Sequence, residues 1–322
     1  MASQCNQDRY PVTRRTRSNQ LPQWQSDFLH RHQLGTAYLE FALKWFTPLV
    51  IDLVEHQNRA GRPILAAITG CQGSGKTTVS DFLCASLEAE HALHTVVLSL
   101  DDFYLKHAQR QVLAQAVHPL LITRGVPGTH DMPLLHQTLE DLLDIQRCEP
   151  VAIPRFEKAI DDRREPSDWD RVTTPVQIVL LEGWCLGALP QTPATLAQPI
   201  NALEQLEDSS AQWRGYSNAI LSREFEPLYA LVDQWIMLRA PSFECVFAWR
   251  QEQERKLAAT LLPGQASKLM NDNALRRFIQ HYERLTRQCL DTLPDTVDHL
   301  LTLNEQRQIT AYTHRQQAGA SL

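Results

Sequence analysis

The stretch GCQGSGKTT, residues 70–78, decides the fold of this 322-residue chain. The apolar run ILAAIT, residues 64–69, precedes it and predicts a buried strand, and the run TTVSDFLCASL after it predicts a helix over 76–89. A strand, a glycine-rich turn and a helix in this order fit the pattern G-x-x-x-x-G-K-[ST] of a phosphate-binding loop. An accidental match to this pattern would rarely be preceded by a predicted strand and followed by a predicted helix.

The residue types in this loop suit the phosphates of a nucleotide. Glycines let successive backbone N–H groups point inward, and the helix that follows adds a partial positive charge at its N-terminus. We expect Lys76 to reach the β and γ phosphates and the Thr77 hydroxyl to bind Mg²⁺, so ATP and Mg²⁺ are the expected cofactors. The predicted nucleotide-binding residues are Gly70, Gln72, Gly73, Ser74, Gly75, Lys76, Thr77 and Thr78.

The bulk composition is that of an ordinary globular protein. Hydrophobic residues make up 43% of the chain, and the 31 Lys plus Arg against 37 Asp plus Glu give a net charge of -6, which argues against nucleic acid as the main partner. The seven cysteines are scattered without a CxxC pair, as is typical of reduced thiols in the cytoplasm. Charged residues and a proline interrupt the apolar stretch over 38–54, so no membrane span is expected. The oligomeric state stays open.

The pattern divides the chain into an N-terminal extension, residues 1–60, and a phosphate-loop domain, residues 61–322. The first twenty residues carry four arginines and favour a disordered basic tail over a transit peptide. Apolar residues recur at helical spacing over 24–60, and Pro48 predicts a kink or a boundary between two helices.

After Gly61, short apolar runs alternate with helical ones, which predicts an α/β fold of three layers around a central, mainly parallel sheet. Residues 186–217, rich in Pro, Gln, Ala and Ser, indicate an irregular connection. Strands are expected at 64–69, 95–100, 151–153, 177–181, 234–238 and 299–303, and helices at 76–89, 132–145, 219–231, 243–261 and 273–290.

Carboxylates follow two of the expected strands. Asp101 and Asp102 come after TVVLSL, and Glu182 comes after QIVLL. Because the carboxyl ends of parallel strands lie along one edge of a sheet, these side chains should face the γ-phosphate. One carboxylate can take the proton of an acceptor hydroxyl while another holds magnesium. We assign Asp101 as the base and Glu182 as the metal ligand, and Asp102 either assists magnesium or only forms the turn.

The segments SLDDFYL (99–105) and LLEGW (180–184) resemble the P-loop kinases related to uridine kinase, phosphoribulokinase and pantothenate kinase. RGVPGTHD (124–131), IPRFEK (153–158), residues 163–169 and LLEGWCLGA (180–188) together resemble the plant and fungal D-glycerate 3-kinases in order and spacing. The resemblance covers about residues 62–302 and implies phosphorylation of the 3-hydroxyl of D-glycerate by ATP, with Asp101 at the position of the base. The stretch EKAIDDRRE (157–165) departs from that family, which is richer in Gly and Ser there.

Candidate residues for the acceptor follow from its chemistry. D-Glycerate is a small carboxylate, and a guanidinium can pair with it through two hydrogen bonds. Of the arginines between the strands we favour Arg124 and Arg155, with His130 and Asp131 as further substrate-binding candidates. Two structural alternatives stay open, because Arg124 could pair with Asp131 and Asp131 could cap a helix.

The segment FAWRQEQE (247–254) resembles the lid helix of the same kinases. Arg250 on it could stabilise the transferring phosphoryl group, which makes Lys76, Asp101 and Arg250 the predicted catalytic residues. A helical pair between Arg250 and Glu254 competes with that interpretation.

Two other functions remain possible from the sequence. One is a kinase for a nucleoside, a pantothenate-like molecule or a sugar phosphate; a nucleoside would need an aromatic stacking surface, for which Phe103, Tyr104 and Phe156 are candidates. The other is a nucleotide-dependent switch ATPase, which would need no carboxylate facing an acceptor. A guanine-specific switch would carry an NKxD motif, and the sequence has none.

Overall fold

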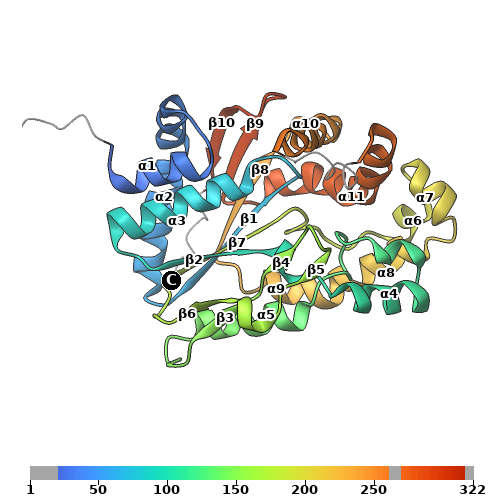
Figure 1. Ribbon diagram of the computed structural model, residues 1–322, viewed down its shortest axis with the longest axis horizontal. Coiled ribbons are helices and arrows are strands. Elements are labelled where there is room, and N and C mark those ends of the chain that lie inside the picture. The colour runs from blue at the N-terminus through green and yellow to red at the C-terminus, as the bar shows by residue number, and fades with distance from the viewer. Residues whose placement is uncertain (1–20, 261–269, 316–322) are drawn as a thin grey trace, which may run out of the picture.

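A six-stranded sheet, covered by helices on both faces, forms the centre of the computed structural model, which describes residues 21–260 and 270–315 (Figure 1). The strand order is β10-β9-β8-β1-β7-β2, in which only the edge strand β10 is antiparallel to its neighbour. The predicted α/β fold with a mainly parallel sheet is confirmed. The strands are β1 (Ile64–Gly70), β2 (Thr95–Ser99), β7 (Ile178–Gly183), β8 (Gln234–Arg239), β9 (His299–Leu303) and β10 (Ile309–His314).

Strand β1 is buried along its whole length because both faces of the sheet are covered. Ile64, Ala66 and Ile68 point into a core shared with α1 (Gln23–Arg31), α2 (Thr36–Ala60) and α3 (Lys76–His91). Leu65 and Ala67 point into a second core, formed with α5 (Met132–Leu143) and residues 220–228. This alternation produces the predicted three layers, and it explains why the strand reads as a continuous apolar run.

The N-terminal helices pack directly on the sheet domain. Phe46, Leu49 and Leu53 of α2 belong to the same core as Phe82 of α3. Pro48 lies inside α2, which is a single helix from Thr36 to Ala60, so the boundary between the two helices lies at 32–35 rather than at Pro48. The basic tail expected over 1–20 lies outside the described residues.

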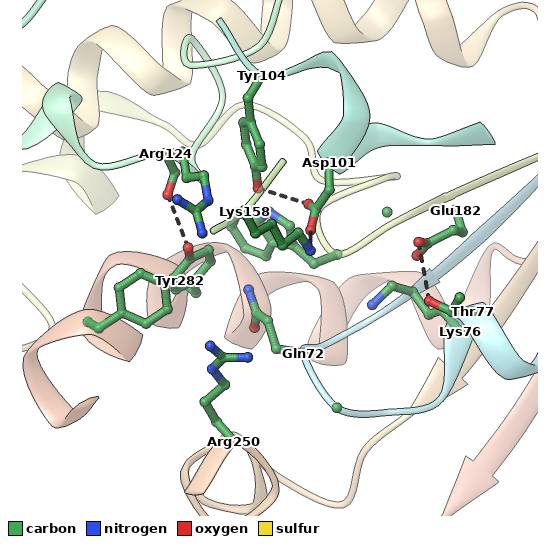
Figure 2. A pocket seen from close by; sticks show the side chains of 14 residues that line it. Gln72, Lys76, Thr77, Asp101, Tyr104, Arg124, Lys158, Glu182, Arg250 and Tyr282 are labelled. Carbon is green, nitrogen blue, oxygen red and sulfur yellow. Dashed lines mark hydrogen bonds and ion pairs between the residues drawn. The ribbon is translucent and has the colours of Figure 1, made fainter. Parts of the chain in front are cut away.

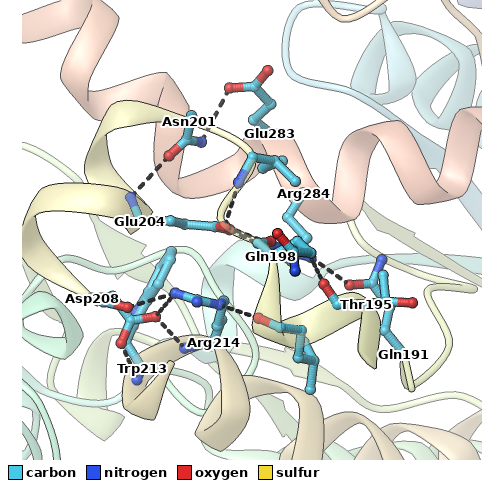
Figure 3. A network of polar contacts seen from close by, with 12 residues as sticks. Gln191, Thr195, Gln198, Asn201, Glu204, Asp208, Trp213, Arg214, Glu283 and Arg284 are labelled. Atoms are coloured by element: carbon cyan, nitrogen blue, oxygen red, sulfur yellow. Dashed lines mark hydrogen bonds and ion pairs between the residues drawn. The ribbon is translucent and has the colours of Figure 1, made fainter. Parts of the chain in front are cut away.

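The expectation of an irregular connection over 186–217 is wrong, because three short helices form there: α6 (Pro193–Ala197), α7 (Ala202–Glu207) and α8 (Gln212–Ile220). Side-chain oxygens of Thr192 and Asn201 accept hydrogen bonds from the first turns of α6 and α7. Figure 3 shows how a buried ion pair holds this segment to α11 (Asp272–Thr292), with Glu204 and Arg284 2.5 Å apart. Helices of five to nine residues are too short to show an apolar period.

Other elements differ from the expectations in smaller ways. The strand expected at 151–153 exists as β3 (Val151–Ile153), but it pairs with β6 (Asp170–Val172) in a separate two-stranded sheet. The helix expected over 219–231 is divided into the end of α8, a π-helical turn (Leu221–Phe225) and α9 (Glu226–Tyr229). Elements that the sequence did not predict are α4 (His107–Ala116), β4 (Phe156–Glu157), β5 (Asp162–Arg163), β6, β10 and the single 3₁₀ turns Leu100–Phe103, Pro119–Ile122, Pro166–Asp168 and Leu293–Asp295.

The long helices near the C-terminus match their expected positions. α10 (Glu244–Thr260) and α11 agree with the ranges 243–261 and 273–290 within two residues. Leu275 and Ile279 of α11 enter the first core, and Tyr282 and Leu285 enter the second. In the part of the chain that the structure describes, no helix is both long enough and apolar enough to cross a membrane.

Candidate active site

The predicted phosphate loop lies at the carboxyl end of β1 and leads into α3. Gly70 has to be glycine there, because a Cβ would stand 2.8 Å from the Leu238 carbonyl oxygen and 2.8 Å from Ser74 Oγ. Lys76 Nζ donates to the Gly70 and Cys71 carbonyl oxygens at 2.8 and 3.2 Å. Ser74 Oγ and the polar side-chain atoms of Gln72 are buried, and no partner for them lies among the described residues.

These groups fit the phosphates of a nucleotide. The first-turn amides of α3 have no acceptor within the helix, and Ser74 and Gln72 add side-chain donors beside them. Lys76 contributes the positive charge. The loop therefore presents the donors that a triphosphate needs.

A cavity of about 180 Å³ opens next to the loop (Figure 2). The carboxylates of Asp101 and Glu182 line it, from the ends of β2 and β7. Four cationic side chains line it as well: Lys76, Arg124, Lys158 and Arg250. The structure thus brings the three predicted catalytic residues Lys76, Asp101 and Arg250 to one space.

The predicted magnesium ligands Thr77 and Glu182 lie together at the loop. Thr77 Oγ1 is 3.4 Å from Glu182 Oε1, and Ser99 Oγ donates to the same oxygen at 2.7 Å. Burial raises the pKa of Glu182, against the effect of the nearby Lys76 charge. A hydroxyl and a carboxylate oxygen beside a phosphate loop are a suitable donor set for Mg²⁺.

The structure does not bring Asp102 to this cavity. Its carboxylate accepts hydrogen bonds from Arg155 Nη1 at 2.9 Å and from the Phe156 backbone at 3.0 Å. Asp102 therefore anchors the start of β4 beside the strand end, and of the two alternatives for this residue the geometry favours the turn over magnesium.

Asp101, the predicted base, is held between two donors. Tyr104 donates its hydroxyl proton to Oδ1 at 2.8 Å, and Lys158 Nζ donates to Oδ2 at 2.6 Å. Burial alone would raise the pKa of Asp101, but Lys158 and the two hydrogen bonds outweigh it and lower the pKa to about 2. The carboxylate is consequently ionised at neutral pH, as a proton acceptor must be.

Of the four predicted acceptor-binding residues, Arg124 lines the cavity. Its guanidinium lies 5.4 Å from the centre of the Phe156 ring, and its Nη1 pairs with Asp161, not with Asp131. Asp131 instead caps α5, by accepting from Leu134 N at 3.3 Å, and pairs with Arg163.

Arg155 and His130 do not reach the cavity lining either. Arg155 pairs with Asp102 and Asp170. His130 is buried and stacks on the Tyr104 ring at 4.6 Å, and burial lowers its pKa to about 4. His130 therefore packs against Tyr104, and Arg155 holds Asp102, the residue next to Asp101.

The segment RGVPGTHD packs beside the site and contributes Arg124 to the cavity lining. The Leu105 and Asp131 amides donate to the Thr129 and Phe103 carbonyl oxygens at 2.9 and 2.7 Å, which docks the segment beside Asp101. Gly125, with φ 143°, lets Tyr282 approach so closely that a Cβ would stand 2.5 Å from its hydroxyl. The motif is therefore needed for packing as much as for contact with a ligand.

Sequence reasoning missed Lys158, Trp184 and Tyr282, and it named Tyr104 only as a possible stacking surface for a nucleoside; all four line the cavity. Lys158 ends the quoted segment IPRFEK, so a lysine within a motif was the available signal. Tyr282 lies on α11, which is far along the chain from the loop. Arg250 lies 6.0 Å from the Phe278 ring, and its alternative partner Glu254 lies outside the described side chains.

No family model matches the chain. An uncharacterised kinase of Schizosaccharomyces pombe, mug58, is 30% identical to it over 246 residues, which cover 72% of this chain and 83% of that protein. The chloroplastic D-glycerate 3-kinase of Arabidopsis thaliana is 29% identical over 242 residues, which cover 72% of this chain and 48% of that protein. A solved structure of D-glycerate 3-kinase from Cryptococcus neoformans is similar with a TM-score of 0.71 and 25% identity, and the match covers 84% of this chain and 99% of that one.

Proposed function

The chain belongs to the family of P-loop kinases that includes D-glycerate 3-kinase, and from this premise we propose that it transfers the γ-phosphoryl group of ATP to the 3-hydroxyl of D-glycerate. The observation that carries the proposal is the arrangement around the cavity. An ionised Asp101, paired with Lys158, lines the same small cavity as the phosphate loop and the Arg124 guanidinium. This arrangement supplies a base for a hydroxyl, a cation for a carboxylate and a site for phosphates.

The size and lining of the cavity support a small anionic acceptor. Its volume is about 180 Å³, whereas pockets for drug-sized ligands range from roughly 300 to 1,000 Å³. The three aromatic side chains that a nucleoside could have stacked on, Phe103, Tyr104 and Phe156, are 0, 3 and 8% exposed. His130 already stacks on one face of the Tyr104 ring, and Phe156 packs against the same ring at an interplanar angle of 77°.

The loop residues would hold ATP, and Thr77 and Glu182 would hold Mg²⁺. When bound, Mg²⁺ neutralises charge on the phosphate oxygens. Lys76 and Arg250 bring two further positive charges to the same cavity. Because phosphoryl transfer has a loose transition state, positioning and charge neutralisation by these side chains account for most of the rate.

On the acceptor side, Asp101 orients the hydroxyl and receives its proton, while Lys158 and Tyr104 keep the carboxylate in place. Arg124 pairs with the carboxylate of the acceptor. A guanidinium has five N–H donors, so the pairing of Nη1 with Asp161 leaves donors for a second carboxylate. Phe156 supports the flat face of the guanidinium.

The test is ADP formation measured with D-glycerate, L-glycerate, uridine and pantothenate as separate acceptors. We expect turnover with D-glycerate and a fall in kcat of about 10²- to 10⁴-fold in Asp101→Asn, the range for loss of a general base. Glu157→Gln, on the exposed side of the neighbouring hairpin, is the matched control and should keep its activity. Turnover of another acceptor without turnover of glycerate would refute the substrate, and full activity in Asp101→Asn would refute the base.

A further inference from the structure

A second cluster of polar side chains lies at the amino ends of the strands β8 and β9, whereas the phosphate loop lies at the carboxyl end of β1. Gln234 begins β8 and His299 begins β9, and both strands run parallel to β1, whose carboxyl end carries the loop. Beside them is a cavity of about 640 Å³, lined by α2, β10 and the start of β8. The proposed phosphoryl transfer uses none of these residues.

Three possible metal ligands converge there from three different elements. Asp52 lies on α2, His299 on β9 and His314 on β10. Asp52 Oδ2 is 3.1 Å from His299 Nε2, and Asp52 Oδ1 is 3.4 Å from His314 Nε2. One donor atom from each of the three lies within 4.8 Å of the others.

The sheet itself sets up this convergence. His299 and His314 are direct partners across the antiparallel β9–β10 pair, so their rings lie on one face of the sheet and stack at 4.6 Å with an interplanar angle of 18°. Helix α2 packs over that face and places Asp52 opposite both nitrogens. His299 is fully buried, and the side chain of His314 is partly open to the cavity.

We propose that Asp52, His299 and His314 bind a divalent transition metal ion, for which Zn²⁺ is the best match. Two imidazole nitrogens and a carboxylate are a donor set that Zn²⁺ accepts and that Mg²⁺, which prefers oxygen, does not. Metal–ligand bonds of about 2.0–2.1 Å in a tetrahedron require donor atoms roughly 3.3 Å apart. The separations are 3.1 Å from Asp52 Oδ2 to His299 Nε2 and 3.4 Å from Asp52 Oδ1 to His314 Nε2, so each carboxylate oxygen lies near that spacing from one imidazole nitrogen.

The groups around His299 suit a metal ligand. His299 Nε2 meets oxygens of Asp52 and Gln234, at 3.1 and 2.9 Å, so without a metal it carries the ring proton. Its Nδ1 lies 2.9 Å from the Tyr312 hydroxyl, which can donate or accept. Binding of Zn²⁺ at Nε2 would require the tautomer with the ring proton on Nδ1, and the Tyr312 hydroxyl oxygen can accept a hydrogen bond from that proton. Such a hydrogen bond fixes the orientation of a ligating imidazole.

The site would fasten the N-terminal extension to the C-terminal strand. Asp52 belongs to the long helix α2, and His314 is the last residue of β10. A metal that binds the folded chain and not the unfolded one raises stability by mass action. The consequence is a cation-dependent tie between two segments at opposite ends of the described chain.

The test uses the full chain, stripped with a chelator and titrated with Co²⁺ as a spectroscopic probe for Zn²⁺. We expect about one Co²⁺ per chain with the visible absorption of a low-coordinate site, which Zn²⁺ displaces, and a rise in Tm on addition of Zn²⁺. His314→Ala should weaken Co²⁺ binding at least about tenfold and abolish the rise in Tm. Asp52→Asn is the second variant and should do the same.

Two controls separate this site from its neighbours. His56→Ala removes a histidine that lines the same cavity and is not among the three ligands, so it should retain Co²⁺ binding. Thr77→Ala changes the phosphate loop and should also retain it. The proposal is overturned by absence of Co²⁺ uptake, by uptake that His314→Ala leaves unchanged, or by uptake that Thr77→Ala removes.

Discussion

At the scale of single residues, Lys158 determines the protonation of Asp101. The pKa of Asp101 is about 2, below its ordinary 3.8, because Lys158 and the hydrogen bonds outweigh the effect of burial. The group therefore stabilises the fold above about pH 3.8, and this contribution is lost as the pH falls through about 2.

We predict that Lys158→Met raises the pKa of Asp101, since burial then acts with less opposition. The acid limb of the pH profile of kcat/KM for the acceptor should move to higher pH, and a rate profile measured down to the limit of stability checks this. Lys158→Arg keeps the charge and should leave the limb near its original place. An acid limb that stays in place in Lys158→Met would contradict the pairing.

Asp161 positions Arg124, so loss of its carboxylate should weaken binding of the acceptor. Its carboxylate pairs with Arg124 and, at 2.9 Å, with the buried Arg110, which also donates to the Asp161 carbonyl oxygen at 2.8 Å. Asp161→Asn should raise the KM for the acceptor about tenfold and change kcat much less, because one charge-assisted contact is weakened. Steady-state kinetics at saturating ATP measure this split. A fall in kcat of about tenfold with no change in KM would assign Asp161 to the chemical step instead.

The sequence predicted the parts of the site that follow long strands. The positions of the loop, Asp101 and Glu182 could be predicted, because β1, β2 and β7 mark one edge of the sheet. The partners of Asp102, Asp131 and Arg155 could not, because their pairing depends on short strands of the two small sheets, β3–β6 and β4–β5. Strands of two or three residues have no period to detect.

At the scale of elements, the helices α7 and α11 are joined by a buried ion pair, Glu204–Arg284 (Figure 3). An exposed ion pair, Glu207–Arg277, joins the same two helices. The Glu204 and Arg284 side chains are 0 and 8% exposed, whereas those of Glu207 and Arg277 are 40 and 51% exposed. Glu204→Ala leaves a buried guanidinium unpaired and should lower the free energy of unfolding by roughly 3–5 kcal/mol.

The exposed pair is the matched control for this prediction. Glu207→Ala should cost about 1 kcal/mol or less, because solvent screens that pair. Urea unfolding followed by circular dichroism measures both variants. Similar losses in the two would mean that burial does not set the strength of the attachment.

The long elements could be predicted and the short ones could not. α11 shows a clear helical period, and α3 and α10 are long stretches without Gly or Pro. β1 and β8 are apolar runs bounded by turns. Side chains that accept hydrogen bonds from their first turns help to specify α6, α7 and α8. α6 and α7 also contact α11, which is distant in the sequence. Proline and glutamine in such a segment suggest a loop until those contacts are known.

At the scale of the whole molecule, two buried histidines connect stability to pH. Burial lowers the pKa of His130 and of His281 to about 4, against an ordinary 6.5. The unfolded chain therefore binds more protons between these values, so stability is complete above about pH 6.5 and falls as the pH drops toward 4.

We predict a matching slope in the free energy of unfolding, measured by urea titration at several pH values from 7.5 to about 4.5. His130→Phe, which keeps a ring to stack on Tyr104, should reduce the slope by close to one proton. A profile that is flat below pH 6.5, or the same slope in the variant, would show that these histidines do not stay neutral in the fold.

The position of β1 in the sheet also sets an order of events during synthesis. Ile64 pairs with Ile178, and Ala66 pairs with Gln234, so both neighbours of the strand that carries the loop are made long after it. A nascent chain that ends before β8 contains every loop residue but lacks one of the two strands that hold the loop in place. Pairing between strands that are distant in the sequence slows folding. The nascent chain should therefore bind nucleotide only after β8 has been synthesised, and the affinity should then appear in one step.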